Sequence, residues 1–241
     1  MALPVFFHDG NFVQGQPLWL EEDTARHVVQ VLRMQLGEQL MLTDGKGNAA
    51  TVSIIETAKK KCAVSVDVVV HHTPVKPVLH LAVAFTRNTA RNEWLLEKAT
   101  ELGAATITPL QATRSERERI KPERWNNILV SAMLQSQQYY VPQLNEPTTP
   151  EQLIRYTGNI PQRLVAHCME DKIRKPLPLA CLPGLETVIL IGPEGDFTPE
   201  EVAMFEENNF TAISLGKRRL RTETAAMSVC SYFNAINYEE A

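Results

Sequence analysis

The stretch TVILIGPEGDFTPEEV, residues 187–202, decides the fold class of this chain. Its apolar first part is typical of a β-strand that is buried on both faces, and the run stops at Gly192. The letters TPEE at 198–201 form a capping box with proline in the first helical turn, which predicts a helix that ends near Asn208. A buried strand that leads directly into a capped helix is the repeating unit of an α/β sheet.

The same alternation extends over residues 78–241. Apolar runs short enough for buried strands occupy residues 79–85, 105–110, 163–168 and 211–216. Helical spacing or a helix-start pattern marks residues 88–103, 123–139, 149–152 and 222–240. Strands that alternate with helices and read as continuous apolar runs predict a mainly parallel α/β sheet.

The N-terminal part has a β-like pattern instead. Asp44, Gly45 and Gly47 lie between two alternating apolar segments, which predicts a hairpin, and one amphipathic helix is expected at about 22–34. Two prolines within four residues then resist both helix and sheet, which is typical of a linker. The chain is therefore expected to divide into a small β-barrel or sheet domain at 1–72, a linker at 73–77 and an α/β domain at 78–241.

The composition indicates a globular protein. Of 241 residues, 44% are hydrophobic; no apolar run approaches the roughly 18 residues of a membrane span, and the N-terminus lacks signal-peptide features. We expect a soluble, cytoplasmic protein with no membrane partner. The four widely spaced cysteines predict buried reduced thiols, with no metal site and no disulfide framework (Cys62, Cys168, Cys181 and Cys230).

The charge pattern is mixed. A net charge of −4 argues against a protein whose whole surface binds nucleic acid. The basic residues nevertheless gather at 59–61, 114–124, 172–175 and 217–221. Such local patches attract a polyanion although the total charge is negative.

Two loops leave predicted strands at the end where an open α/β sheet binds ligands. In the first, residues 191–197, two glycines around Pro193 let backbone groups approach a ligand closely, although a tight turn alone would also use them. In the second, residues 215–225, four cations follow a glycine within five residues, and a helix of small residues begins. A solvated surface loop is the alternative for this charge run, but its position at a strand end favours function.

These two loops resemble a known family. GPEGDF at 192–197 and LGKRRLRTETA at 215–225 are similar to the GPEGGF and LGxRILRTETA signatures of the RsmE family, the 16S rRNA uridine-N3 methyltransferases of the SPOUT superfamily. HVVQVLR at 27–33, EKATELG at 97–103 and QSQQYYVP at 135–142 follow in the family's order. The resemblance therefore covers nearly the whole chain.

The resemblance implies a PUA-like RNA-binding β-barrel domain followed by an α/β SPOUT methyltransferase domain with a C-terminal trefoil knot. It also implies S-adenosyl-L-methionine as the cofactor, a homodimer, and 16S rRNA within the small ribosomal subunit as the partner. The implied reaction methylates N3 of a uridine. Knots are so rare in proteins that the strand and helix pattern alone would not predict one.

Three residues depart from the family pattern. Asp196 replaces the second glycine of GPEGGF, so the backbone there must tolerate a Cβ, and a carboxylate stands near the cofactor loop. Arg219 replaces an aliphatic residue and adds a cation that is available to RNA. Gln138 stands where an arginine is common, so the segment around it is not assigned an anion-binding role.

The resemblance assigns cofactor binding mainly to backbone in three strand-end loops. The residues are Glu170, Ile191, Gly192, Pro193, Glu194, Gly195, Leu215, Gly216, Leu220, Arg221 and Thr222. Glu170 would accept a hydrogen bond from a ribose hydroxyl, although a solvated loop carboxylate is the alternative for this residue taken alone.

Arg221 and Glu223 are the candidate catalytic residues. The uridine N3 proton must leave before or during methyl transfer, and the planar cation of Arg221 suits the uracil carbonyl oxygens or a phosphate. Glu223 has three open roles: it orients Arg221, acts as a base, or only favours the dipole of the helix that begins there.

Four arginines are assigned to RNA phosphate: Arg26, Arg33, Arg87 and Arg91. For each one taken alone, a solvated position on a helix surface is the alternative. Two other functions remain open for the whole protein: an RNA-binding dimer without enzymatic activity, or a methyltransferase that acts on another RNA position. A small-molecule α/β enzyme is disfavoured for dinucleotides and nucleoside triphosphates, because neither GxGxxG nor a Walker A motif is present.

Overall fold

The computed structural model describes residues 3–116, 121–169 and 172–238. The chain forms two compact units. The first holds the residues up to Pro74 together with Met133–Val141, and the second holds Val75–Ala132 and the residues from Pro142 onward. The boundary after Pro74 falls inside the expected linker. Residues 133–141 pack with the N-terminal unit, whereas the sequence division places them in the C-terminal domain.

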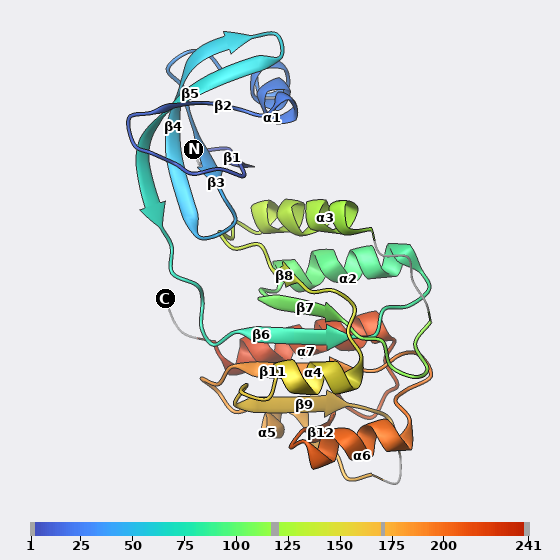
Figure 1. Cartoon of the computed structure of the whole chain (residues 1–241). Coiled ribbons are helices and arrows are strands. Elements are labelled where there is room, and N and C mark those ends of the chain that lie inside the picture. The colour runs from blue at the N-terminus through green and yellow to red at the C-terminus, as the bar shows by residue number, and fades with distance from the viewer. Residues whose placement is uncertain (1–2, 117–120, 170–171, 239–241) are drawn as a thin grey trace. The chain divides into compact units, whose positions relative to one another are not determined.

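Five strands form the sheet of the first unit (Figure 1): β1 Val5–Phe7, β2 Pro17–Trp19, β3 Gln39–Thr43, β4 Asn48–Ala58 and β5 Lys61–His71. Their order is β1-β3-β4-β5-β2, and every pair is antiparallel except β1 with β3. Leu40, Val52 and Val64 form the core on one face with Val28. The edge strands β1 and β2 do not pair with each other within the described ranges, so the backbone pairing is that of an open sheet, one of the two forms expected from the sequence.

The helix expected at 22–34 begins at the predicted residue but changes its form. An α-helix, α1, covers Glu22–Arg26, and a π-helix, η1, continues over His27–Val31. The helix ends early because Arg33 has a φ of 56°, a left-handed conformation that cannot continue a right-handed helix.

The predicted hairpin turn joins β3 to β4. Asp44 Oδ1 accepts hydrogen bonds from the backbone N–H groups of Lys46, at 2.8 Å, and Asn48, at 3.0 Å. Gly47 has a φ of 96°, and a Cβ there would collide with the Tyr140 hydroxyl group. Its N–H group donates to the Tyr139 carbonyl at 2.9 Å, so the turn is built to receive the segment 133–141.

Seven parallel strands form the sheet of the second unit: β6 Leu79–Val83, β7 Thr106–Pro109, β8 Gln143–Leu144, β9 Gln162–Ala166, β10 Lys175–Pro176, β11 Thr187–Ile191 and β12 Thr211–Ser214. Their order is β10-β12-β9-β11-β6-β7-β8. The five predicted strands are confirmed. The two-residue edge strands β8 and β10 are too short to leave a sequence pattern.

Six helices accompany these strands: α2 Thr89–Glu101, α3 Pro122–Gln135, α4 Pro150–Tyr156, α5 Leu177–Ala180, α6 Pro199–Glu207 and α7 Thr222–Ile236. The capping box before α6 is confirmed, because Thr198 Oγ1 accepts from the Glu201 N–H group and Glu201 Oε2 accepts from the Thr198 N–H group.

Helices cover both faces of the sheet, with α4 in front of it and α7 behind it in Figure 1. Val188 and Leu190 of β11 share one core cluster with Leu153 of α4 and Phe205 of α6, and α7 packs on β6 and β11. All five residues of β11 are buried, as expected for a strand covered on both sides.

The cysteines differ in their exposure. Cys62, Cys181 and Cys230 are buried free thiols, but Cys168 is exposed, so its expected burial is wrong. It is the second residue after β9, where the chain leaves the sheet. Within the described ranges, no helix is long and apolar enough to cross a membrane, and no group of three or more potential metal ligands comes together.

Buried His80 makes stability depend on pH. Its side chain on β6 contacts Thr108 Oγ1 at 2.7 Å, and burial lowers its pKa from 6.5 to about 4. Below pH 6.5 the unfolded chain binds a proton on His80 that the folded chain binds only near pH 4. The free energy of unfolding is therefore highest above pH 6.5 and decreases as the pH falls towards 4. The loss reaches about 3 kcal/mol.

Urea unfolding of the parent and of His80→Gln between pH 4 and 7 measures this effect. The variant should lose less unfolding free energy over the interval than the parent, because glutamine does not titrate. An equal loss of unfolding free energy between pH 7 and 4 in the two proteins would show that His80 does not cause the pH dependence.

Candidate active site

A cavity of about 400 Å³ lies in the second unit, where β9, β11 and β12 end. Its walls are the loops that follow these three strands and the first turn of α7. The lining residues are Ala166, His167, Cys168, Arg174, Ile191, Gly192, Pro193, Glu194, Asp196, Ile213, Ser214, Leu215, Gly216, Arg218, Arg219, Leu220, Arg221, Thr222 and Ala225. The volume lies within the range of about 300–1,000 Å³ that is typical of small-molecule sites.

The loop after β11 holds its shape through Gly192 and Asp196. A Cβ at Gly192 would lie 3.0 Å from the buried Phe197 ring, which leaves little room for any side chain. Asp196 has a φ of 62°, a left-handed conformation that glycine, asparagine and aspartate adopt most readily. The signature glycine at this position therefore suits a loop that needs a left-handed φ, and Asp196 adopts that φ as well.

The carboxylate of Asp196 ties two of the cavity loops together. Its Oδ2 accepts a hydrogen bond from the Cys168 N–H group at 2.7 Å, and its Oδ1 accepts from the Phe197 N–H group at 2.9 Å. Cys168 belongs to the loop after β9. This chain thus uses its departure from the family signature to connect the loops after β9 and β11.

The loop after β9 brings two residues that the sequence reading did not assign. His167 is buried, and burial lowers its pKa, although the Asp196 carboxylate acts in the opposite direction. Arg174 Nη1 donates to the His167 carbonyl at 2.7 Å. The predicted strand 163–168 includes His167, whereas β9 ends at Ala166, so the sequence placed His167 inside the sheet; no local pattern indicates that Arg174 returns to the cavity.

The loop between β12 and α7 is joined to the loop after β11 at two points. Thr222 Oγ1 donates to the Gly192 carbonyl, and Arg219 Nη2 donates to the Glu194 carbonyl, both at 3.4 Å. Gly216 has a φ of 123°, which side chains rarely permit. Arg221 is the residue before the first turn of α7 and is exposed.

The cavity carries more positive than negative charge. Four arginines line it, against the carboxylates of Glu194 and Asp196 (Arg174, Arg218, Arg219 and Arg221). The N-terminus of α7 points its positive dipole end at the same place. Such a site favours an anionic or electron-rich group at its rim and accepts a zwitterionic ligand.

Comparison with known proteins identifies the family. A family model described as "RNA methyltransferase domain" matches residues 73–234, and one described as "RNA methyltransferase PUA domain" matches residues 20–67. The Ribosomal RNA small subunit methyltransferase E of Bacillus subtilis is 30% identical over 228 residues, which cover 90% of this chain and 88% of that protein. This chain belongs to the ribosomal RNA small subunit methyltransferase E family.

Solved structures agree with membership of the methyltransferase E family. A probable rRNA-methyltransferase from Porphyromonas gingivalis has a TM-score of 0.90 and 35% identity, covering 98% of each chain. The Ribosomal RNA small subunit methyltransferase E from Neisseria gonorrhoeae, bound to S-adenosyl methionine, has a TM-score of 0.80 and 27% identity, again covering 98% of each chain. The α/β methyltransferase fold and the PUA-like domain expected from the sequence are therefore confirmed.

The structure brings most of the assigned cofactor residues of this methyltransferase E family member into one place. Nine of them line the cavity: Ile191, Gly192, Pro193, Glu194, Leu215, Gly216, Leu220, Arg221 and Thr222. Gly195 does not line it and lies beside the aliphatic part of Arg114, whose Nη1 donates to its carbonyl at 2.8 Å. Glu170 lies outside the described residues.

Glu223 does not line the cavity. Its carboxylate is buried, and Oε1 lies 3.6 Å from Nε of Arg91. Within the described residues it forms no ion pair with Arg221, so the structure gives no support to the role of orienting that residue.

The four arginines assigned to RNA have different surroundings. Arg33 and Arg87 are exposed, and Arg26 forms an exposed ion pair with Asp23 at 2.9 Å. Arg91 contacts two carboxylates, those of Glu194 and Glu223, so its charge is partly compensated within the protein.

Replacing Asp196 by glycine should loosen the loop after β9. Glycine accepts the φ of 62° without strain, but the 2.7 Å hydrogen bond to the Cys168 N–H group is lost. We expect about tenfold faster hydrogen exchange at Cys168, with global stability changed by no more than about 1 kcal/mol, since one net hydrogen bond is worth roughly that much. Exchange mass spectrometry measures the exchange rate at Cys168 and the global stability. Asp196→Asn is the control, because asparagine keeps a hydrogen-bond acceptor. Unchanged exchange at Cys168 in the glycine variant would contradict this role.

Proposed function

We propose that this protein uses S-adenosyl-L-methionine to methylate N3 of a uridine in 16S ribosomal RNA. The observation that carries the proposal is the cavity at the ends of β9, β11 and β12, with its arginine rim, in a chain of the methyltransferase E family. The related Neisseria gonorrhoeae protein is bound to S-adenosyl methionine. An rRNA substrate accounts for the cationic rim, and S-adenosyl-L-methionine accounts for a cavity of this size.

The lining of the cavity fits S-adenosyl-L-methionine chemically. Ile191, Ile213 and Leu220 offer apolar surface for a flat purine, and the strand-end backbones offer N–H and carbonyl groups to its edges. Glu194 and Asp196 suit the cationic groups of the methionine part, and the arginines suit its carboxylate. When bound, the cofactor supplies a methyl group activated by a sulfonium.

The residues of the chain must prepare the uridine. Its N3 proton passes to a general base or to solvent water before or during methyl transfer, so negative charge develops on the uracil carbonyl oxygens. Arg221, exposed at the rim and always charged, is the residue that we assign to stabilise this charge. Fixed alignment of the two reactants within the cavity supplies much of the remaining acceleration.

RNA binding would use exposed cations on both units. We assign phosphate contacts to Arg26 and Arg33 of the first unit, and to Arg87 of the second, with Arg218 and Arg219 at the cavity rim. Membership of the family further supports a C-terminal trefoil knot, a homodimer and action in the cytoplasm on the small ribosomal subunit. These belong to the proposal.

Two measurements test the proposed function. Calorimetric titration of the folded protein with S-adenosyl-L-methionine should give saturable one-site binding. Mass spectrometry of nucleosides from 16S rRNA, with and without the gene, should show 3-methyluridine only with the gene. Loss of a different methylated nucleoside would favour another RNA position, and absence of cofactor binding would favour an RNA-binding dimer without enzymatic activity.

A further inference from the structure

Arg91 is held at a fixed place beside the cavity loops. It is the third residue of α2, and its backbone N–H group donates to the side chain of Asn88, the N-cap of that helix, at 3.2 Å. The turn before the helix is braced by Thr86, whose N–H group donates to Asn92 Oδ1 at 3.0 Å and whose carbonyl accepts from Asn92 Nδ2 at 2.7 Å. The backbone that carries Arg91 is therefore firmly anchored.

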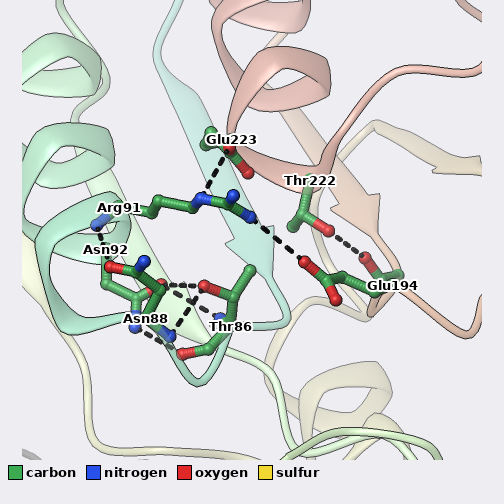
Figure 2. Close-up of polar contacts among 8 residues, drawn as sticks. Thr86, Asn88, Arg91, Asn92, Glu194, Thr222 and Glu223 are labelled. Atoms are coloured by element: carbon green, nitrogen blue, oxygen red, sulfur yellow. Dashed lines mark hydrogen bonds and ion pairs between the residues drawn. The ribbon is translucent and has the colours of Figure 1, made fainter.

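The guanidinium group of Arg91 joins two segments that are far apart in the sequence. Its Nη1 lies 3.4 Å from Glu194 Oε1 in the loop after β11, and its Nε lies 3.6 Å from Glu223 Oε1 in the first turn of α7 (Figure 2). Figure 2 shows the side chain extending from α2 between the two carboxylates. Helix α2, the loop after β11 and the first turn of α7 thus meet at the Arg91 guanidinium group.

Glu223 depends on this cation. Only 11% of its side chain is exposed, and its Oε2 is buried without a hydrogen-bond partner in the described part of the chain. There, Arg91 is also the sole cation within 4 Å of the Glu223 carboxylate. An ionised carboxylate that loses its partner in such a place is strongly destabilising, because neither water nor a cation solvates it. The first turn of α7 would therefore shift to rehydrate the carboxylate.

We propose that Arg91 is a positioning residue that compensates Glu223 and Glu194 and thereby fixes the two loops of the cofactor cavity. The benefit to cofactor binding rests on the proposed function, whereas the positioning of the two loops by Arg91 does not. On the cavity side, the same loops are joined by the contact of Thr222 with the Gly192 carbonyl. Arg91 adds a second connection through Glu194 and Glu223, and Glu223 stands two residues after Arg221, the residue to which we assign charge stabilisation.

Removal of the Arg91 charge tests this role without any ligand. In Arg91→Met, hydrogen exchange should become about tenfold faster in residues 192–197 and in the first turn of α7. In Arg91→Met with Glu223→Gln, exchange in the first turn of α7 should return to within about threefold of the parent, because the buried charge has gone. Exchange in residues 192–197 should recover only in part, because Glu194 still lacks Arg91. Arg91→Lys keeps the charge and should show an intermediate effect.

Arg124→Met is the matched control. Arg124 pairs with Glu93, a residue of α2 whose carboxylate is also largely buried: Arg124 Nε lies 2.6 Å from Glu93 Oε1. Neither residue lines the cavity. Its loss should leave exchange in residues 192–197 unchanged, which separates a local effect from general destabilisation. Unchanged exchange in Arg91→Met, or equally fast exchange in the double variant, would overturn the proposal.

A second readout separates this inference from the proposed function. Affinity for S-adenosyl-L-methionine in the absence of RNA should fall about five- to tenfold in Arg91→Met and recover in the double variant. If Arg91 only contacted phosphate, cofactor affinity and loop exchange would stay at parental values while the KM for RNA rose, which would overturn the proposal. If the parent bound no cofactor, the proposed function would fail, and the exchange experiment would still decide the role of Arg91.

Discussion

Arg221→Ala should lower kcat for RNA methylation about 100- to 1,000-fold at saturating cofactor and RNA. This is the effect expected when one preorganised group that stabilises developing charge is removed. Arg221 lines the cavity at the N-terminal end of α7, where its charge and the helix dipole reinforce each other. Single-turnover assays with a tritiated methyl donor measure the chemical step directly.

Arg218→Ala provides the comparison for this result. Arg218 is an exposed arginine of the same loop and also lines the cavity, but it precedes α7 by several residues. Its removal should mainly raise the KM for RNA, by less than about tenfold, because an exposed phosphate contact contributes little to the chemical step. Equal losses of kcat in both variants would show that Arg221 has no special role.

Ala225→Phe should reduce affinity for S-adenosyl-L-methionine more than 100-fold. Ala225 is a buried residue of α7 that lines the cavity, so a phenyl ring there would occupy the space assigned to the ligand. The fold should survive, because the ring enters a cavity and does not overpack a filled core. Calorimetry measures the affinity, and thermal unfolding confirms that the variant is folded.

Ala235→Phe is the matched variant on the same helix. Ala235 is exposed and does not line the cavity. The added ring should therefore leave cofactor affinity within about twofold of the parent, as is usual for surface substitutions away from a site. Parental affinity in Ala225→Phe would place the cofactor elsewhere.

Local signals predict the α/β unit well. Strand β11 and the capping box of α6 are visible in the sequence because a buried parallel strand needs a continuous apolar run and a helix start needs specific hydrogen-bonding side chains. The position of the cavity follows from the strand-end rule. These features depend on residues that are neighbours in the chain.

The remaining features depend on tertiary contacts. Nothing near Arg174 or Arg91 in the sequence indicates which carbonyl or carboxylate each one meets. The π-helix at His27–Val31 continues the apolar spacing of an ordinary helix, so the pattern could not distinguish them. Asp196 departs visibly from the family pattern, but its hydrogen bond to the Cys168 N–H group depends on how the two loops fold together.

The segment Met133–Val141 has a consequence for the evolution and engineering of this chain. Because it packs with the N-terminal unit, the polypeptide changes unit three times, after Pro74, after Ala132 and after Val141. Cutting after Pro74 would remove the backbone partners of Gly45 and Gly47 from the hairpin that needs them. The N-terminal PUA-like unit is therefore not encoded by one continuous segment: a transplant that keeps its fold would have to carry a second, internal piece of the gene with it.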